Sequence, residues 1–200
     1  MHWALAEYEQ AEALLAEAQQ AVQALGDPAA AADTHWLDAL IASELGNTGR
    51  RDAALLAAEK IAAQLGDAQR QVIARAATAR GAVFAYPRLA RERWGPEFGD
   101  GTGPWPIGVA TWVRDYLGNL AFSDGDNRPA IIHRLRVHED AVMSGQWHRA
   151  VIALTNIGAC FSNLNDHDNC PIWMQRGLDE ARRLGWPRAA MGRQLAYRCA

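Results

Sequence analysis

A turn signal centred on glycine returns along this chain at intervals of about 40 residues. The stretches Ala24–Asp27 (ALGD) and Gln64–Asp67 (QLGD) place their glycines 40 residues apart, and Met143–Gln146 and Arg183–Trp186 repeat this spacing 79 residues after Gly66. Further turn signals lie about halfway between these glycines, at 46–49, 86–87 and 165–166. Glycine ends helices readily because it adopts the left-handed conformation. The spacing predicts helical hairpins with a period of about 40 residues and helices of roughly 14–18 residues.

The sequence between the turns favours helices and gives almost no support to strands. Within 3–25, apolar residues recur at alternating steps of three and four, which lays one stripe along a helix. Pro28 follows directly and is suited to start the next helix. Helix pairs at a fixed period are typical of an α-solenoid, so we expect an all-α fold with residues 1–200 forming a single repeat array.

Composition and charge exclude several classes of protein. A net charge of −3 provides no general basic field for nucleic acid or an anionic membrane. No apolar stretch approaches the roughly 20 residues that span a bilayer, and the N-terminus lacks the apolar run of a signal peptide. Three cysteines without a C-x-x-C pair argue against a disulfide framework. These features predict a cytoplasmic protein that binds neither membrane nor nucleic acid.

One segment interrupts the rhythm. Trp94–Pro106 holds three prolines and four glycines in thirteen residues, so we expect a short helix at about 88–94 followed by an irregular loop at 95–106. Two interpretations of this loop stand side by side. It covers an edge of the solenoid with its tryptophans, or it is a functional loop that reaches over a groove.

The stretch Leu154–Cys170 carries the most informative pattern. Large residues (Leu154, Ile157, Phe161, Met174) alternate with small ones (Gly158, Cys170, Gly177) at the spacing of a helical hairpin whose helices cross closely. This pattern resembles the tetratricopeptide repeat, with HEAT-type repeats as the competing family. The resemblance implies a right-handed superhelix whose first helices of each pair line a concave groove. The segment 178–192 is similar to the repeat regions ahead of the catalytic domain in bacterial diguanylate cyclases.

The polar cluster Asn165–Cys170 is predicted to be the turn of that hairpin. Asp168 or Asn169 is expected to cap the second helix, with Pro171 in its first turn and Cys170 buried at the crossing. A thiol buried there cannot also bind an ion at the turn, so we expect neither a metal nor a cofactor. The competing hypothesis is an enzyme or metal protein that uses Asp166, His167 and Asp168. The histidines show no metal-binding spacing, and the serines and glycine-rich stretches lack catalytic contexts.

The resemblance therefore implies a non-catalytic interaction or sensory module that binds a protein or peptide partner. Asn156 is the leading candidate in the groove, because an amide both donates to and accepts from an extended backbone. The other candidate groove residues are Thr155, Ser162, Asn163, Arg149, Arg193, Tyr197, Arg114 and Trp112. Arg75 and Arg114 suggest a locally cationic face that favours an acidic partner.

Three further expectations concern the wider protein. The catalytic Gly-Gly-Asp-Glu-Phe motif is absent from these 200 residues, and the last helix lacks a partner, so we expect a fragment of a longer protein that regulates an output domain such as a diguanylate cyclase. An exposed apolar end face predicts a homodimer. The alternative function is a small-molecule or peptide-signal receptor with an aromatic wall formed by Trp94–Pro106 and Trp112.

Overall fold

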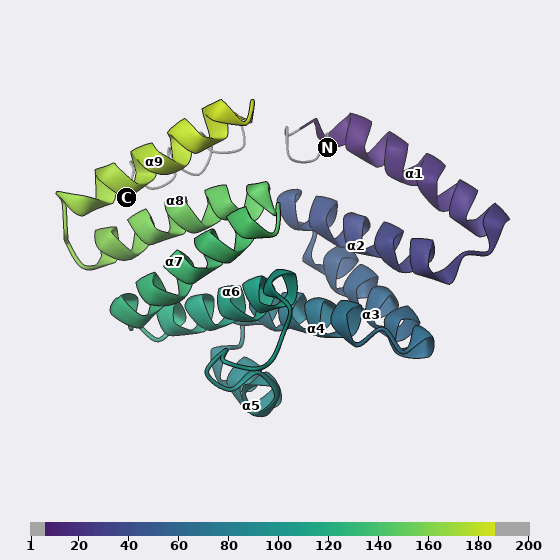
Figure 1. Ribbon diagram of the computed structural model, residues 1–200, viewed down its shortest axis with the longest axis horizontal. Coiled ribbons are helices and arrows are strands. Elements are labelled where there is room, and N and C mark those ends of the chain that lie inside the picture. Colours follow the sequence, from purple (N-terminus) through teal and green to yellow (C-terminus); the bar gives the residue numbers. More distant parts are fainter. Residues whose placement is uncertain (1–6, 187–200) are drawn as a thin grey trace. The chain divides into compact units, whose positions relative to one another are not determined.

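Helices account for all the regular secondary structure of the described part of the chain. A computed structural model describes residues 7–186, and within this range it contains no strand (Figure 1). The helices are α1 (Tyr8–Leu25), α2 (Pro28–Glu44), α3 (Thr48–Leu65), α4 (Ala68–Ala82), α5 (Pro87–Phe98), α6 (Ile107–Ser123), α7 (Asn127–Met143), α8 (Trp147–Asn163) and α9 (Asn169–Arg183). The prediction of an all-α fold is confirmed. The solenoid and its handedness stay predictions.

The turns lie where the glycine spacing predicts them. Residues with positive φ occur every 20 residues in two runs, first at Gly26, Gly46 and Gly66, then at Gly125, Gly145, Asn165 and Gly185. Asn165, with a φ of 55°, occupies the one place in these runs where glycine is missing. Asparagine tolerates the left-handed region better than most residues, which is why it can replace glycine there.

The chain divides into two compact units, Met1–Gly81 and Ala82–Ala200. In each unit, helices that follow one another along the chain pack together, as α2 does with α3 and α7 does with α8. The core of the first unit is built largely from alanine, with one cluster of Ala11, Leu15 and Ile41. The second unit buries larger side chains, including Tyr116 and Phe98.

Three helices of each unit correspond to one another at a constant offset of 79 residues. Helix α2 becomes α6 under this offset with both ends matching, and α3 and α4 begin where α7 and α8 do. The left-handed residues Gly46 and Gly66 likewise correspond to Gly125 and Gly145. The second unit therefore repeats the order and spacing of α2, α3 and α4, and equivalent positions in the two units can be compared residue by residue.

The helix before the irregular loop is longer than predicted. We expected it to end near Trp94, but α5 continues to Phe98 with Pro96 inside its last turn. Proline removes a single N–H donor, and so near the end of a helix it costs little hydrogen bonding. The irregular segment is therefore shorter than the predicted 95–106 and begins at Gly99, whose N–H donates to the Gly95 carbonyl.

Gly158 and Gly177 of the α8–α9 hairpin lie at the close crossing that their spacing predicts. A methyl group added to Gly158 would come within 2.8 Å of the Met174 side chain, and one added to Gly177 within 2.9 Å of the Thr155 methyl group. The two helices approach closely because neither position carries a side chain.

Across residues 7–186, no helix combines the length and apolar character needed to cross a membrane.

Candidate functional site

The residues expected to line a groove on α6 and α8 are for the most part buried. Arg149 forms an ion pair with Asp115, and its guanidinium carbon lies 3.2 Å from the centre of the Trp112 ring. Only 8% of the Arg149 side chain and 3% of the Asp115 side chain is exposed. A charge pair at this depth, stacked on an aromatic ring, is part of the packing between α6 and α8. Arg149 and Trp112 therefore do not form an open binding surface.

Two more of the expected groove residues have partners within the fold. Thr155 is 1% exposed, and its hydroxyl donates to the Ile152 carbonyl at 2.9 Å, which places it in the α8–α9 packing beside Gly177. It is not accessible to a ligand. Arg114 forms an ion pair with Asp140. Arg75 likewise pairs with Glu59, so carboxylates neutralise both arginines of the predicted cationic face.

The remaining α8 candidates lie closer to solvent. Asn156 and Ser162 are half-buried and Asn163 is exposed. The Asn156 side chain makes no hydrogen bond within residues 7–186, but its backbone carbonyl accepts one from buried Arg134 at 2.7 Å. These side chains are spread along the length of α8. Arg193 and Tyr197 lie outside the described residues.

The polar turn differs in detail from its prediction. Asp166 caps α9, because its carboxylate accepts from the Asn169 backbone N–H at 3.0 Å, whereas Asp168 makes no capping bond. That backbone hydrogen bond holds the pKa of Asp166 below its usual value. Cys170 is only half-buried, so its predicted burial at the crossing is wrong. Among residues 7–186, no group of three His, Cys, Asp or Glu side chains is arranged to hold a metal ion.

The aromatic side chains around the irregular loop pack against one another. Trp105 meets Phe98 edge to face at 6.3 Å, and Phe98 in turn meets the fully buried Tyr116 at 5.5 Å. Trp94 is 7% exposed. These contacts favour the interpretation in which the loop covers helices α5 and α6. They do not leave the open aromatic wall expected of a receptor.

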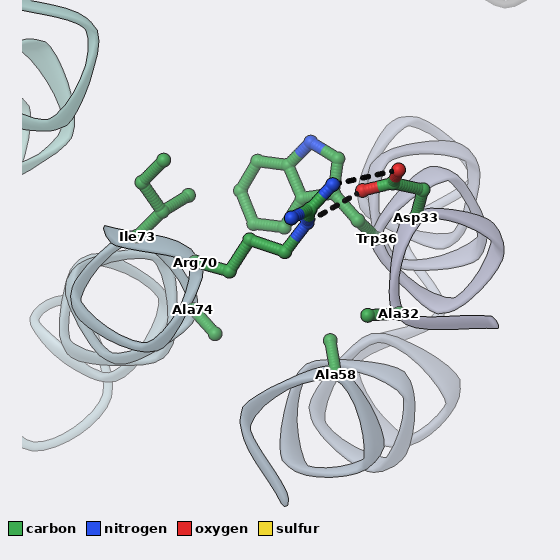
Figure 2. Close-up of a pocket in the computed structure, with 7 residues that line it drawn as sticks. All are labelled: Ala32, Asp33, Trp36, Ala58, Arg70, Ile73 and Ala74. Atoms are coloured by element: carbon green, nitrogen blue, oxygen red, sulfur yellow. Dashed lines mark hydrogen bonds and ion pairs between the residues drawn. The ribbon is translucent and has the colours of Figure 1, made fainter. Parts of the chain in front are cut away.

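A cavity lies instead within the first unit, between α2, α3 and α4. It encloses about 240 Å³ and is lined by Ala32, Asp33, Trp36, Ala58, Arg70, Ile73 and Ala74. Figure 2 shows the methyl groups of the three alanines converging on the space beneath the Arg70 side chain, with the Trp36 indole beside the guanidinium. The cavity thus has an apolar floor and a polar rim, which is the usual composition of a binding pocket.

Arg70 is held in place by two carboxylates. Its guanidinium donates two hydrogen bonds to Asp33, at 2.9 and 3.0 Å, and one to Asp67. Asp67 also accepts from the Arg70 backbone N–H at 3.0 Å, at the start of α4. The side-chain hydrogen bonds to Asp33 and Asp67 raise the pKa of Arg70, and the Arg70 backbone N–H lowers the pKa of Asp67. Arg70 and Asp67 therefore stay charged across the physiological pH range.

Comparison at the 79-residue offset explains why this cavity is open. Each residue that lines the cavity has an equivalent 79 positions later. From Ala32 to Ala74, in chain order, the equivalents are Thr111, Trp112, Asp115, Val137, Arg149, Ile152 and Ala153. All of these are buried. In each unit an arginine lies against a tryptophan and an aspartate that are three residues apart in the sequence. The order of these two is reversed: the first unit has Asp33 and then Trp36, and the second has Trp112 and then Asp115. In the second unit Thr111 and Val137 replace Ala32 and Ala58, so larger side chains stand where the first unit has only methyl groups.

Sequence reasoning missed this site. None of Trp36, Asp33, Arg70 or the three alanines belongs to a motif that the sequence analysis identified. The sequence does contain a signal for it, which is a repeated spacing. Arg70 follows Asp33 by 37 residues and Trp36 by 34, and Arg149 follows Trp112 by 37 residues and Asp115 by 34.

In comparisons with known proteins, the sequence matches no family model and no curated protein.

Proposed function

We propose that this chain is a non-catalytic module that binds a segment of a protein partner, and that the cavity between α2 and α4 receives one side chain of that segment. The cavity supplies the observation on which this proposal depends. Its apolar floor, the partly exposed Trp36 and the fixed Arg70–Asp33 pair combine burial with orientation, which is what an anchoring pocket requires.

The size of the cavity separates a peptide from a small molecule. Pockets that enclose a drug-sized ligand have volumes of roughly 300–1,000 Å³. At about 240 Å³ the cavity is smaller than this range, and it suits a single large side chain from an extended or helical segment better than a whole metabolite. For this cavity, the volume supports a pocket for one side chain over a site for a small molecule.

The wider role stays a proposal that rests on resemblance. A tetratricopeptide-like array of helical hairpins, coiled into a right-handed solenoid, would present α2 and α4 on the same face. The similarity of 178–192 to regions ahead of bacterial diguanylate cyclases supports a signalling protein whose output domain responds to the bound partner.

Selection from a random peptide library tests the binding function. Twelve-residue peptides displayed on phage are selected on the immobilised full chain and, in parallel, on Ala58→Val. This variant places at position 58 the residue that the second unit carries at Val137, and it fills the cavity without changing the rim. Sequences enriched on the wild type but not on Ala58→Val support the proposal. Equal enrichment on both proteins, or none on either, contradicts it.

A further inference from the structure

We infer that the partner segment carries a large apolar side chain flanked by lysine or arginine. This inference rests on the proposed function and specifies the chemistry of the ligand. It differs from the expectation drawn from the sequence, which was an acidic partner attracted by the arginines of the groove. The argument for a basic segment comes from the charges around the cavity.

The rim of the cavity carries more negative than positive charge. Arg70 is its only cation among the lining residues, and it is bonded to both Asp33 and Asp67. A ligand carboxylate would have to approach this guanidinium past two carboxylates that already occupy its donors, and like charges placed together disfavour binding. A ligand cation meets the opposite situation, because 57% of the Asp33 side chain is exposed beside the cavity.

Nearby arginines do not reverse this balance. Arg75 forms an ion pair with Glu59, and Arg50 bonds to both Glu12 and Asp38. Over the whole first unit, Met1–Gly81, there are eleven Asp and Glu residues against six Arg and Lys, a formal net charge of −5. The protein as a whole carries −3, so the excess of acid belongs to the unit that holds the cavity. A field of this sign attracts a basic segment and speeds its association.

The floor of the cavity requires the apolar part of the motif. Ala32, Ala58 and Ala74 are 1%, 5% and 1% exposed and present only methyl groups. A charged group inserted among them would lose its hydration without a partner. An apolar side chain therefore enters the cavity, while the cations of its neighbours stay at the solvent-facing rim near Asp33.

The peptides from the selection described above provide the test. The most enriched peptide is synthesised with a fluorophore, and its Kd for the full chain is measured by fluorescence anisotropy at low and high salt. We expect an apolar residue with lysine or arginine on at least one side. Ala58→Val should weaken binding roughly ten- to hundredfold, the effect of excluding one large apolar side chain from burial. Asp33→Asn should weaken it about two- to fivefold, as expected for an exposed ion pair.

The control peptide exchanges the flanking lysine or arginine for glutamate and keeps the apolar residue. It should bind more weakly than the parent peptide, and added salt should reduce the difference. If the selected peptides are acidic, or if the exchange to glutamate leaves the affinity unchanged, the inference about charge is wrong while the binding function stands. If binding is the same with Ala58→Val, the cavity is not the site and both proposals are overturned.

A second variant protects this test against a failure of folding. Ala32→Thr introduces the residue found at Thr111, at a position on α2 rather than α3. Each variant is first compared with the wild type by far-UV circular dichroism and thermal melting. A folded Ala32→Thr protein that binds the selected peptide as tightly as the wild type would overturn the assignment of the cavity even if Ala58→Val did not fold.

Discussion

Arg70 and Arg149 occupy equivalent positions in the two units, and their replacement by methionine gives the sharpest test of this structure. Both pair with an aspartate on a neighbouring helix, but they differ in burial. The Arg70 and Asp33 side chains are 40% and 57% exposed, whereas those of Arg149 and Asp115 are 8% and 3% exposed. Methionine keeps most of the aliphatic length of the arginine and removes its charge, so the two variants differ mainly in what happens to the partner carboxylate.

The difference in burial predicts a large difference in stability. Arg149→Met removes the cation that pairs with the buried Asp115 carboxylate, and breaking a buried ion pair in this way costs about 3–5 kcal/mol. Arg70→Met breaks its partly exposed pairs with Asp33 and Asp67, and each such pair contributes only about 0–1 kcal/mol because water replaces the lost interaction. At about 2–4 °C per kcal/mol for a chain of this size, Tm should fall by roughly 6–20 °C in the first variant and by less than about 8 °C in the second.

Urea denaturation followed by far-UV circular dichroism measures these changes in the free energy of unfolding. A double variant, Asp115→Asn with Arg149→Met, separates the buried charge from lost packing. It should be more stable than Arg149→Met alone, because the buried carboxylate loses its charge together with the cation that paired with it. The reasoning is refuted if Arg149→Met and Arg70→Met lose equal stability, or if the double variant is less stable than Arg149→Met.

Three further predictions concern the second unit, and urea denaturation measures each of them. Gly177→Ala should destabilise the protein by about 1–3 kcal/mol, because the new methyl group lies 2.9 Å from the Thr155 side chain; a gain in stability, as helix propensity alone predicts, would contradict the close crossing. Asp166→Ala should cost about 0.5–2 kcal/mol through loss of the α9 cap, and Asp168→Ala less than about 0.5 kcal/mol; equal losses would contradict this assignment. Burial lowers the pKa of His133 below 6.5. The unfolded chain therefore binds this proton more readily, and stability should fall as the pH drops below about 6.5, less steeply in His133→Gln; identical pH profiles would refute that role.

Much of the fold could be predicted from the sequence, because helix ends depend on local chemistry. The C-terminal cap at Gly26 and the start of α2 at Pro28 follow from the conformations that glycine and proline prefer. The extension of α5 to Phe98 could not be predicted in the same way. Whether Pro96 ends a helix or is tolerated in its last turn depends on the packing around it, such as the burial of Phe98 at 1% exposure.

The candidate site shows the limit of local reasoning more clearly. Sequence spacing placed Arg149 and Thr155 on one helix but gave no measure of their depth, and both are buried. Likewise, Asp166 and Asp168 are similar candidates for a cap in sequence, and only the backbone path decides that Asp166 accepts the hydrogen bond. Burial and hydrogen bonding are set by neighbours that lie far away along the chain.

The sequence alone therefore determined the helical class, the turn positions and the hairpin period, since each follows from interactions between residues close together in the chain. The tertiary structure decided which arginines are buried and where space is left open. The cavity exists because Ala32, Ala58 and Ala74, from three different helices, meet without filling the volume between them. Their equivalents in the second unit differ by only a few carbon and oxygen atoms, and such a difference becomes a cavity only once the helices have packed.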